Sequence, residues 1–216
     1  MAKAVKRRRY ESPQRREQAR ATRRAVLEAA HRLFADRGYG ATTLQAIADA
    51  ASVSVATVYA AFGNKRTVLK ELVDVSIAGD DEPVAIIDRS WVTELRQEPD
   101  RARRVRIFAA NGRRILDRRS GVDAIVRAAA ATDPEIADLW AELRRQRREG
   151  QGRILELVAG PGGVRADLTA EEAGDILFTI LSPDAYLALV GERGWTPERF
   201  EAWSIEQIAG LLPTAG

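Results

Sequence analysis

The sequence predicts an all-α fold, with an N-terminal three-helix helix-turn-helix domain joined to a C-terminal helical bundle that dimerises. Apolar residues recur at helical spacing along most of the 216 residues, and no segment alternates as a half-buried strand does. Two very short helical patterns with a tight turn between them lie near the N-terminus. The breaks between the later helices are short and rich in glycine and proline, which is typical of a bundle.

Residues 42–65, TTLQAIADAASVSVATVYAAFGNK, predict two short helices, the turn between them and the start of a third helix. Thr42 or Thr43 is the N-cap of the first helix, and Gln45 follows Thr42 by three residues, as a capping box requires. Ser54 caps the second helix and Asn64 caps the third. Helices this short bury too little apolar surface to stand alone, so another helix has to cover them.

A longer helix over residues 15–37 supplies that cover through an apolar stripe of Val26, Leu27, Ala30, Leu33 and Phe34. We therefore expect three parts: a basic disordered arm over residues 1–14, a helix-turn-helix domain over 15–64, and a helical ligand-binding and dimerisation domain over 65–216. A helix-turn-helix places its second helix in the major groove of DNA.

Composition excludes several classes of protein. The chain has no cysteine and one histidine, so neither a disulfide framework nor a His-rich metal site is expected. It contains no Ser-His-Asp set, no nucleotide loop and no paired carboxylates in an apolar setting, so we expect no catalytic residues and no cofactor. No run of about 18 apolar residues and no secretory signal is present, which predicts a cytoplasmic protein without a membrane span.

Charge is distributed unevenly along the chain. Residues 1–24 hold ten Lys and Arg against two acidic residues, a formal +8, whereas the whole chain carries +3 and the remaining 192 residues therefore carry −5. A basic end beside a helix-turn-helix favours nucleic acid as the partner. The arm would lie along phosphates or enter the adjacent minor groove.

A string of residues carries a family resemblance. Residues 33–69, LFADRGYGATTLQAIADAASVSVATVYAAFGNKRTVL, resemble the DNA-binding region of the TetR family of ligand-responsive transcriptional repressors. The matching positions are Phe34, Gly38, Thr42-Thr43, Ile47-Ala48, Val53-Ser54, Thr57-Val58-Tyr59, Phe62 and Asn64-Lys65. The resemblance implies phosphate contacts from Thr43, Thr57, Tyr59 and Lys65, and hydroxyl groups and helix N-termini suit phosphate oxygens.

The DNA-facing surface of the second short helix is mostly apolar. Val55, Ala56 and the alanines at 60 and 61 offer no hydrogen bonds, which leaves Ser54 and Thr57 as its polar groups. Thr42 and Gln45 on the preceding helix complete the candidate DNA-binding residues, and glutamine suits adenine. We expect few direct base contacts and a specificity that depends on DNA shape. Ser52 and Ala56 stand where many relatives have glycine, and Arg66 stands where they have glutamate.

The rest of the chain predicts helices over residues 65–78, 83–97, 100–119, 122–131, 134–159, 170–192 and 197–212, with Gly121 ending one of them and Pro183 kinking another. The stripe of the helix over 134–159 has a polar gap at Gln146 and Arg147, which indicates either a wet cavity or a solvent-facing middle. The candidate ligand-binding residues are Trp91, Phe108, Asn111, Trp140, Gln146 and Arg147, and the ligand would be small and hydrophobic.

The last two predicted helices are more apolar than one core face requires, which favours a self-complementary dimer interface. Its candidate residues are Ile180, Leu187, Phe200, Trp203 and Ile208. Two recognition helices about 34 Å apart occupy successive major grooves, so we expect a palindromic DNA operator. The sequence thus predicts a dimeric repressor released from its operator by a ligand. The alternative is a DNA-binding regulator or architectural protein with no effector.

Overall fold

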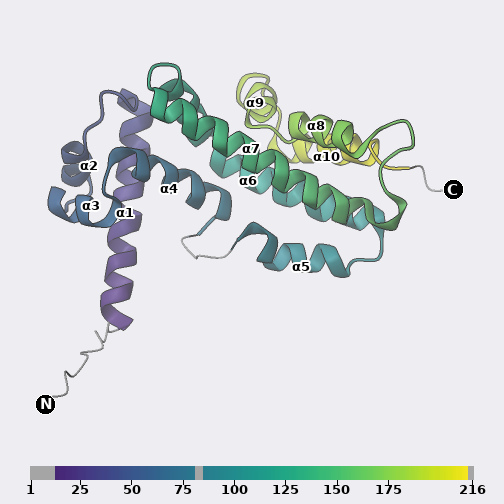
Figure 1. The fold of residues 1–216 in the computed structure, drawn as a ribbon, viewed down its shortest axis with the longest axis horizontal. Coiled ribbons are helices and arrows are strands. Elements are labelled where there is room, and N and C mark those ends of the chain that lie inside the picture. Colours follow the sequence, from purple (N-terminus) through teal and green to yellow (C-terminus); the bar gives the residue numbers. More distant parts are fainter. Residues whose placement is uncertain (1–12, 81–84, 214–216) are drawn as a thin grey trace, which may run out of the picture.

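The computed structural model describes residues 13–80 and 85–213, and every regular element in this part is helical. The predicted all-α class is confirmed. Figure 1 shows a small helical domain at one end, formed around the steep helix α1, and an elongated bundle extending away from it. The predicted arm at residues 1–14 falls mostly outside the described residues, which begin at Pro13, the first residue of α1.

The N-terminal domain consists of α1 (Pro13–Arg37), α2 (Leu44–Ala50), α3 (Val55–Phe62) and the start of α4 (Lys65–Ala78). Three predicted caps are present, because Thr43, Ser54 and Asn64 each accept a hydrogen bond from the backbone N–H three residues later. The capping box is a correction: Thr43 rather than Thr42 is the N-cap, and the Gln45 amide donates to Asp49 Oδ1 at 2.7 Å instead of reaching back.

The C-terminal part is built on two long helices, α6 (Arg101–Ala130) and α7 (Pro134–Ala159), which pack along each other. A 3₁₀ turn, η1 (Ile86–Asp88), and α5 (Ser90–Gln97) cover one side of this pair, as Figure 1 shows. The prediction that a helix ends near Gly121 is wrong. Gly121 is exposed within continuous α6, where a glycine costs only about 1 kcal/mol relative to alanine and long tertiary contacts on both sides outweigh it.

The other side of the pair is covered by α8, α9, η3 and α10. The bounds are Ala170–Ile180 for α8, Pro183–Tyr186 for α9, Leu187–Glu192 for the π-helix η3 and Pro197–Ala209 for α10, with a short 3₁₀ turn η2 at Gly160–Gly162. The predicted helix over 170–192 is therefore broken rather than kinked, because the chain leaves α8 at Leu181 and Ser182 caps a new helix by accepting from Ala185 N–H. The predicted capping box of Thr169 with Glu172 is present.

Two apolar cores result. One core joins α1 to α4 with the end of the α6–α7 hairpin, where Val126, Ile136 and Leu139 are buried. The other lies within the bundle and includes Phe108, Ile154 and Phe200. The helix-turn-helix is thus seated on the tip of the α6–α7 hairpin, with α4 running back along α6.

By length and composition alone, the described segment Ala170–Glu192 qualifies as a membrane span, although the sequence predicts none. It is interrupted at Leu181–Ser182, and 39% of its apolar window is buried against the rest of the chain. Its packing on α6, α7 and α10 accounts for its apolar character, since core helices have the same composition.

Candidate functional site

The end of the molecule formed by α2 and α3 presents the candidate DNA-binding surface. The axes of α2 and α3 differ by 112°, which is the arrangement of a helix-turn-helix. Thr43, Gln45, Ser54, Ala56 and Thr57 are exposed there. Both helix N-termini carry hydroxyl groups, so backbone N–H groups and hydroxyls lie together, as phosphate oxygens require.

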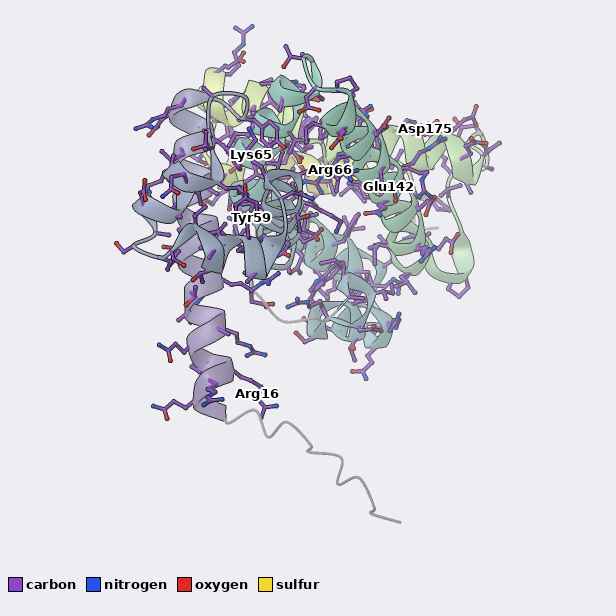
Figure 2. The ribbon with its side chains drawn as sticks, turned by 60° about the vertical axis from the view of Figure 1, so that its left-hand side comes forward. Arg16, Tyr59, Lys65, Arg66, Glu142 and Asp175 are labelled. Atoms are coloured by element: carbon purple, nitrogen blue, oxygen red, sulfur yellow. The ribbon has the colours of Figure 1, made fainter. Side chains whose placement is uncertain are left out.

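Tyr59 is the most exposed large apolar side chain on this surface, with 54% of its area accessible. It projects from α3, and Figure 2 shows it with Lys65 and Arg66 at the helix-turn-helix end, with Glu142 and Asp175 in the bundle. With more than half of its area accessible, Tyr59 can present its hydroxyl to a phosphate. A buried core role for Tyr59 does not fit its exposure.

Thr42 does not reach this surface. Its side chain is 1% exposed, and its hydroxyl donates to the carbonyl of Gly38 at 2.8 Å and to that of Leu33 at 3.3 Å. Thr42 therefore holds the loop between α1 and α2 against the end of α1. We correct its predicted role from a DNA contact to a loop anchor.

Lys65 also turns inward, although the resemblance implies a phosphate contact. Its ammonium donates to the carbonyls of Tyr39 at 2.7 Å and Thr42 at 2.8 Å, and it lies 4.2 Å from the centre of the Tyr39 ring. Burial lowers the pKa of Lys65, while Asp133 acts in the opposite direction, and burial raises the pKa of Tyr39 to about 12. The ammonium thus ties the start of α4 to the α1–α2 loop.

The turn between α2 and α3 is strained at Ser52. Ser52 has φ of +56°, and it is the one non-glycine residue with a positive φ among residues 13–80 and 85–213. A side chain in this left-handed region costs on the order of 1 kcal/mol, which glycine avoids. The departure from glycine noted in the sequence therefore falls where the backbone favours glycine.

Arg23 on α1 is a further basic residue that serves the fold. Its guanidinium donates to the carbonyl of Ala61 at 2.9 Å, pairs with Glu71 and lies 4.6 Å from the centre of the Phe62 ring. Arg66 is exposed at the start of α4, and further exposed basic charge lies on the projecting N-terminal part of α1, where Figure 2 places Arg16 at a distance from Tyr59.

A cavity of about 1330 Å³ lies between the two parts of the molecule. Leu27 of α1 and Leu72 and Val75 of α4 line it on the helix-turn-helix side, and α5, α6 and α7 line it on the bundle side. The volume is ample for a small molecule. Trp91, Phe108, Gln146 and Arg147 all belong to its wall, so the polar gap predicted in α7 faces a cavity rather than only solvent.

Two predicted ligand-binding residues lie off this wall. The Asn111 amide donates to the carbonyl of Ile107 at 2.8 Å, one turn earlier on α6, which satisfies it locally. Trp140 packs against the core of the N-terminal domain, with the Arg144 guanidinium 5.7 Å from its ring centre. Neither side chain is directed at the cavity.

Sequence reasoning missed Arg119, Asp123 and Gln151. Arg119 and Asp123 continue the inward face of α6 at i, i+4 spacing, but that signal was lost because the helix was expected to end at Gly121. Arg119 and Asp123 are 5% and 3% exposed and form an ion pair of 2.7 Å. Gln151 follows Arg147 by one turn on α7, on the same face.

Three of the predicted dimer residues are already buried within one chain. Phe200, Ile208 and Ile180 face the bundle core, because α10 packs on α6 and α8 on α7. Their apolar stripe is therefore used inside the chain and does not form a free interface. Leu187 and Trp203 are half buried and keep an accessible part.

Comparisons with known proteins agree with this geometry. Residues 26–72 match the family described as "Bacterial regulatory proteins, tetR family". No curated protein matches the chain. Three solved structures share the fold over most of their length. A transcriptional regulator of the "TerR/AcrR family" from Aquifex aeolicus VF5 has 18% identity and a TM-score of 0.63, with 87% of this chain and 98% of that chain covered. The fatty acid degradation regulator FadR from Bacillus halodurans has 16% identity and a TM-score of 0.65 (93% of this chain and 96% of that chain), and a transcriptional regulator from Saccharomonospora viridis in complex with choline has 22% identity and a TM-score of 0.61 (87% of this chain and 95% of that chain).

Within the described residues, no group of three or more His, Cys, Asp or Glu is placed to hold a metal ion. The relatives are described as transcriptional regulators rather than enzymes. The family match over residues 26–72 confirms the resemblance of residues 33–69. The helix-turn-helix and its exposed, hydroxyl-rich surface agree with this match. The chain therefore carries the DNA-binding domain of the TetR family on the fold of TetR-family transcriptional regulators.

Proposed function

We propose that the protein is a dimeric, cytoplasmic repressor that binds a palindromic DNA operator and releases it when a small molecule occupies the cavity. The observation that carries this proposal is the position of the cavity. Its wall is shared by α1 and α4, which belong to or adjoin the helix-turn-helix, and by α6 and α7 of the bundle. A ligand there contacts both parts and favours one arrangement of them over another.

A direct connection joins the cavity wall to α4. Arg118 of α6 donates to the carbonyls of Ser76 and Ile77, each at 3.1 Å, and so caps the last turn of α4. The next residue on α6, Arg119, lines the cavity. A ligand that shifts this part of α6 therefore shifts the C-terminal end of α4, whose N-terminal end is tied to the helix-turn-helix through Lys65.

Two of the similar solved structures support a ligand-responsive role. One was solved with choline and another is described as a fatty acid degradation regulator. A cavity of this size between the helix-turn-helix part and the bundle favours an effector over the alternative of a regulator without one, which would pack these parts tightly.

Dimerisation is the second part of the proposal. Figure 1 shows α8, α9 and α10 on the side of the bundle remote from α2 and α3. Ile176 of α8 is 40% exposed, and Leu187 and Trp203, in the same layer of helices, each keep an accessible part. Pairing through this layer leaves both helix-turn-helix domains free to reach DNA.

The test starts with duplexes selected from a random library by the full-length protein and uses fluorescence anisotropy to measure affinity. The proposal predicts an inverted-repeat consensus and an affinity that falls steeply with salt. Selected duplexes without symmetry, or a salt-independent affinity, would contradict a dimeric DNA-binding role.

Gating is tested with three ten-carbon amphiphiles of different charge: decanoate, 1-decanol and decyltrimethylammonium. At least one should lower the affinity for the selected duplex by about 5-fold or more, the usual range of coupling between two sites. Ile115→Trp, which fills the cavity, should abolish the response and keep DNA binding, while Ile107→Trp on the same helix but outside the cavity should keep both. A response that survives Ile115→Trp unchanged would place the effector elsewhere.

A further inference from the structure

Buried polar groups lie beside apolar ones on the bundle wall of the cavity. Arg119 of α6 and Arg147 and Gln151 of α7 are buried or half-buried there, and Phe108, Leu116 and Ile154 supply apolar surface. The other polar residues of the lining include the exposed Gln146 and Arg153 and the paired Arg23 and Glu71. A wall with buried cations beside apolar side chains matches an amphipathic molecule rather than a wholly hydrophobic one.

The Arg119 guanidinium has hydrogen-bonding capacity to spare. Within the described residues its one hydrogen bond runs from Nε to Asp123 Oδ2 at 2.7 Å, which leaves both Nη groups for another acceptor. Both Nη atoms are accessible rather than enclosed in the protein. Because Arg119 lines the cavity, these atoms face the cavity. Guanidinium groups bind carboxylates through such paired N–H groups.

Arg147 lies beside Arg119, and its guanidinium also has hydrogen-bonding capacity that the described residues do not use. Its Nη1 donates to the carbonyls of Phe178 at 3.3 Å and Leu181 at 3.1 Å, and the guanidinium stacks 3.5 Å from the centre of the Phe178 ring. Burial lowers the pKa of Arg147 to about 10, and the positive charge of Arg119 is the next cause. The two cations therefore repel each other across a poorly solvated wall.

One carboxylate balances these two cations only in part. Asp123 pairs with Arg119, and burial raises the pKa of Asp123 while the Arg119 guanidinium opposes that shift. Asp184, the next carboxylate that acts on Arg147, is exposed and already pairs with Arg127. This part of the cavity wall is therefore short of one negative charge.

Two buried acceptors lie in the same region. Gln151 Nε2 donates to the Leu181 carbonyl at 3.3 Å, the same oxygen that Arg147 uses, but its Oε1 has no partner in the described part of the protein, and neither has Asp123 Oδ1. Both oxygens need an N–H or O–H donor, which a carboxylate head group does not supply, so the two arginines alone favour an anion.

We propose that the cavity binds a monoanionic amphiphile, with its carboxylate or equivalent head group held by Arg119 and Arg147 and its apolar body along Phe108, Leu116 and Ile154. This inference rests on the proposed function for the existence of an effector and adds its chemical class. The choline-bound relative takes a cation, whereas the two arginines of this cavity disfavour a cationic head.

Calorimetry with decanoate, 1-decanol and decyltrimethylammonium tests the class. Decanoate should bind at least about 10-fold more tightly than 1-decanol, as expected from one charge-assisted hydrogen bond, and decyltrimethylammonium should bind most weakly. Equal affinities for decanoate and 1-decanol, a preference for the cation, or no binding of decanoate would overturn the proposal.

Two variants locate the head group. R119Q/D123N removes the buried ion pair while keeping the net charge and avoiding an unpaired carboxylate, and R147Q removes the second cation. Each should reduce the affinity for decanoate by about 10-fold and leave that for 1-decanol unchanged. R145Q is the matched control, because Arg145 lies on α7 but is exposed and pairs with Glu142 and Glu149 outside the cavity. Full decanoate affinity in both R119Q/D123N and R147Q would refute the assignment.

DNA binding separates this inference from the proposed function. If decanoate binds with the expected preference but leaves duplex affinity unchanged, the gating proposal fails and the anionic class of the ligand stands. If 1-decanol or decyltrimethylammonium binds more tightly than decanoate and also releases DNA, the gating proposal stands and the anionic class fails.

Discussion

Replacing Lys65 with methionine should destabilise the fold without removing a DNA contact. The ammonium donates to two backbone carbonyls, at 2.7 and 2.8 Å, which methionine leaves without that partner. Hydrogen bonds to charged groups contribute about 1.5–3 kcal/mol each, and the half-buried position and the cost of burying the ammonium reduce the sum. We expect a loss of about 2 kcal/mol in the free energy of unfolding.

Urea unfolding at neutral pH measures the stability, and a shift in midpoint at constant slope identifies a change in stability alone. The salt dependence of duplex binding measures the DNA contact, since each lost phosphate contact lowers the slope of log K against log salt by about 0.9. We expect that slope to be unchanged in Lys65→Met.

Arg66→Gln is the matched control, because Arg66 is the exposed neighbour of Lys65. It should leave stability unchanged and lower the salt slope. The reasoning is refuted if Lys65→Met unfolds at the same urea concentration as the native protein and lowers the salt slope instead.

Three further changes test other parts of the structure. Ser52→Gly should raise the free energy of unfolding by up to about 1 kcal/mol in the same urea assay, because it relieves the left-handed strain at φ +56°; a loss of stability would contradict that explanation. Arg118→Gln should cost about 1–2 kcal/mol by uncapping α4 and should weaken the effect of any cavity ligand on duplex affinity; unchanged coupling would exclude this route. Ile176→Glu should shift the sedimenting species toward monomer and weaken DNA binding, and an unaltered dimer would move the interface away from this face of α8.

The helix-turn-helix was predictable because its signals are local. Thr43, Ser54 and Asn64 cap helices whose start a single sequence reveals, since the bond that each forms spans three residues. Lys65 shows the limit of local signals. Its partners lie 23 and 26 residues earlier, and nothing near Lys65 in the sequence indicates that these two carbonyls will meet it.

The cavity and the interface could be predicted only in outline. On α7, Gln146 and Arg147 interrupt an apolar stripe, and this interruption predicts the cavity. On α6, the contribution of Arg119 could not be predicted, because the sequence did not indicate that α6 continues through Gly121. Apolar periodicity likewise shows that Phe200 and Ile208 are buried, but it does not show whether they pack against the same chain or a second copy. The structure answers this because α10 lies on α6.

The interruption at Leu181–Ser182 ties the far layer of helices to the cavity wall. Leu181 ends α8, and its carbonyl receives hydrogen bonds from both Arg147 and Gln151 on the cavity wall. A head group that attracts Arg147 competes for these bonds and loosens the joint between α8 and α9. In the proposed dimer, the same ligand would act on the helix-turn-helix domains by two routes. One route runs through α4 within each chain, and the other through the angle at which the two chains pair across α8 and α9.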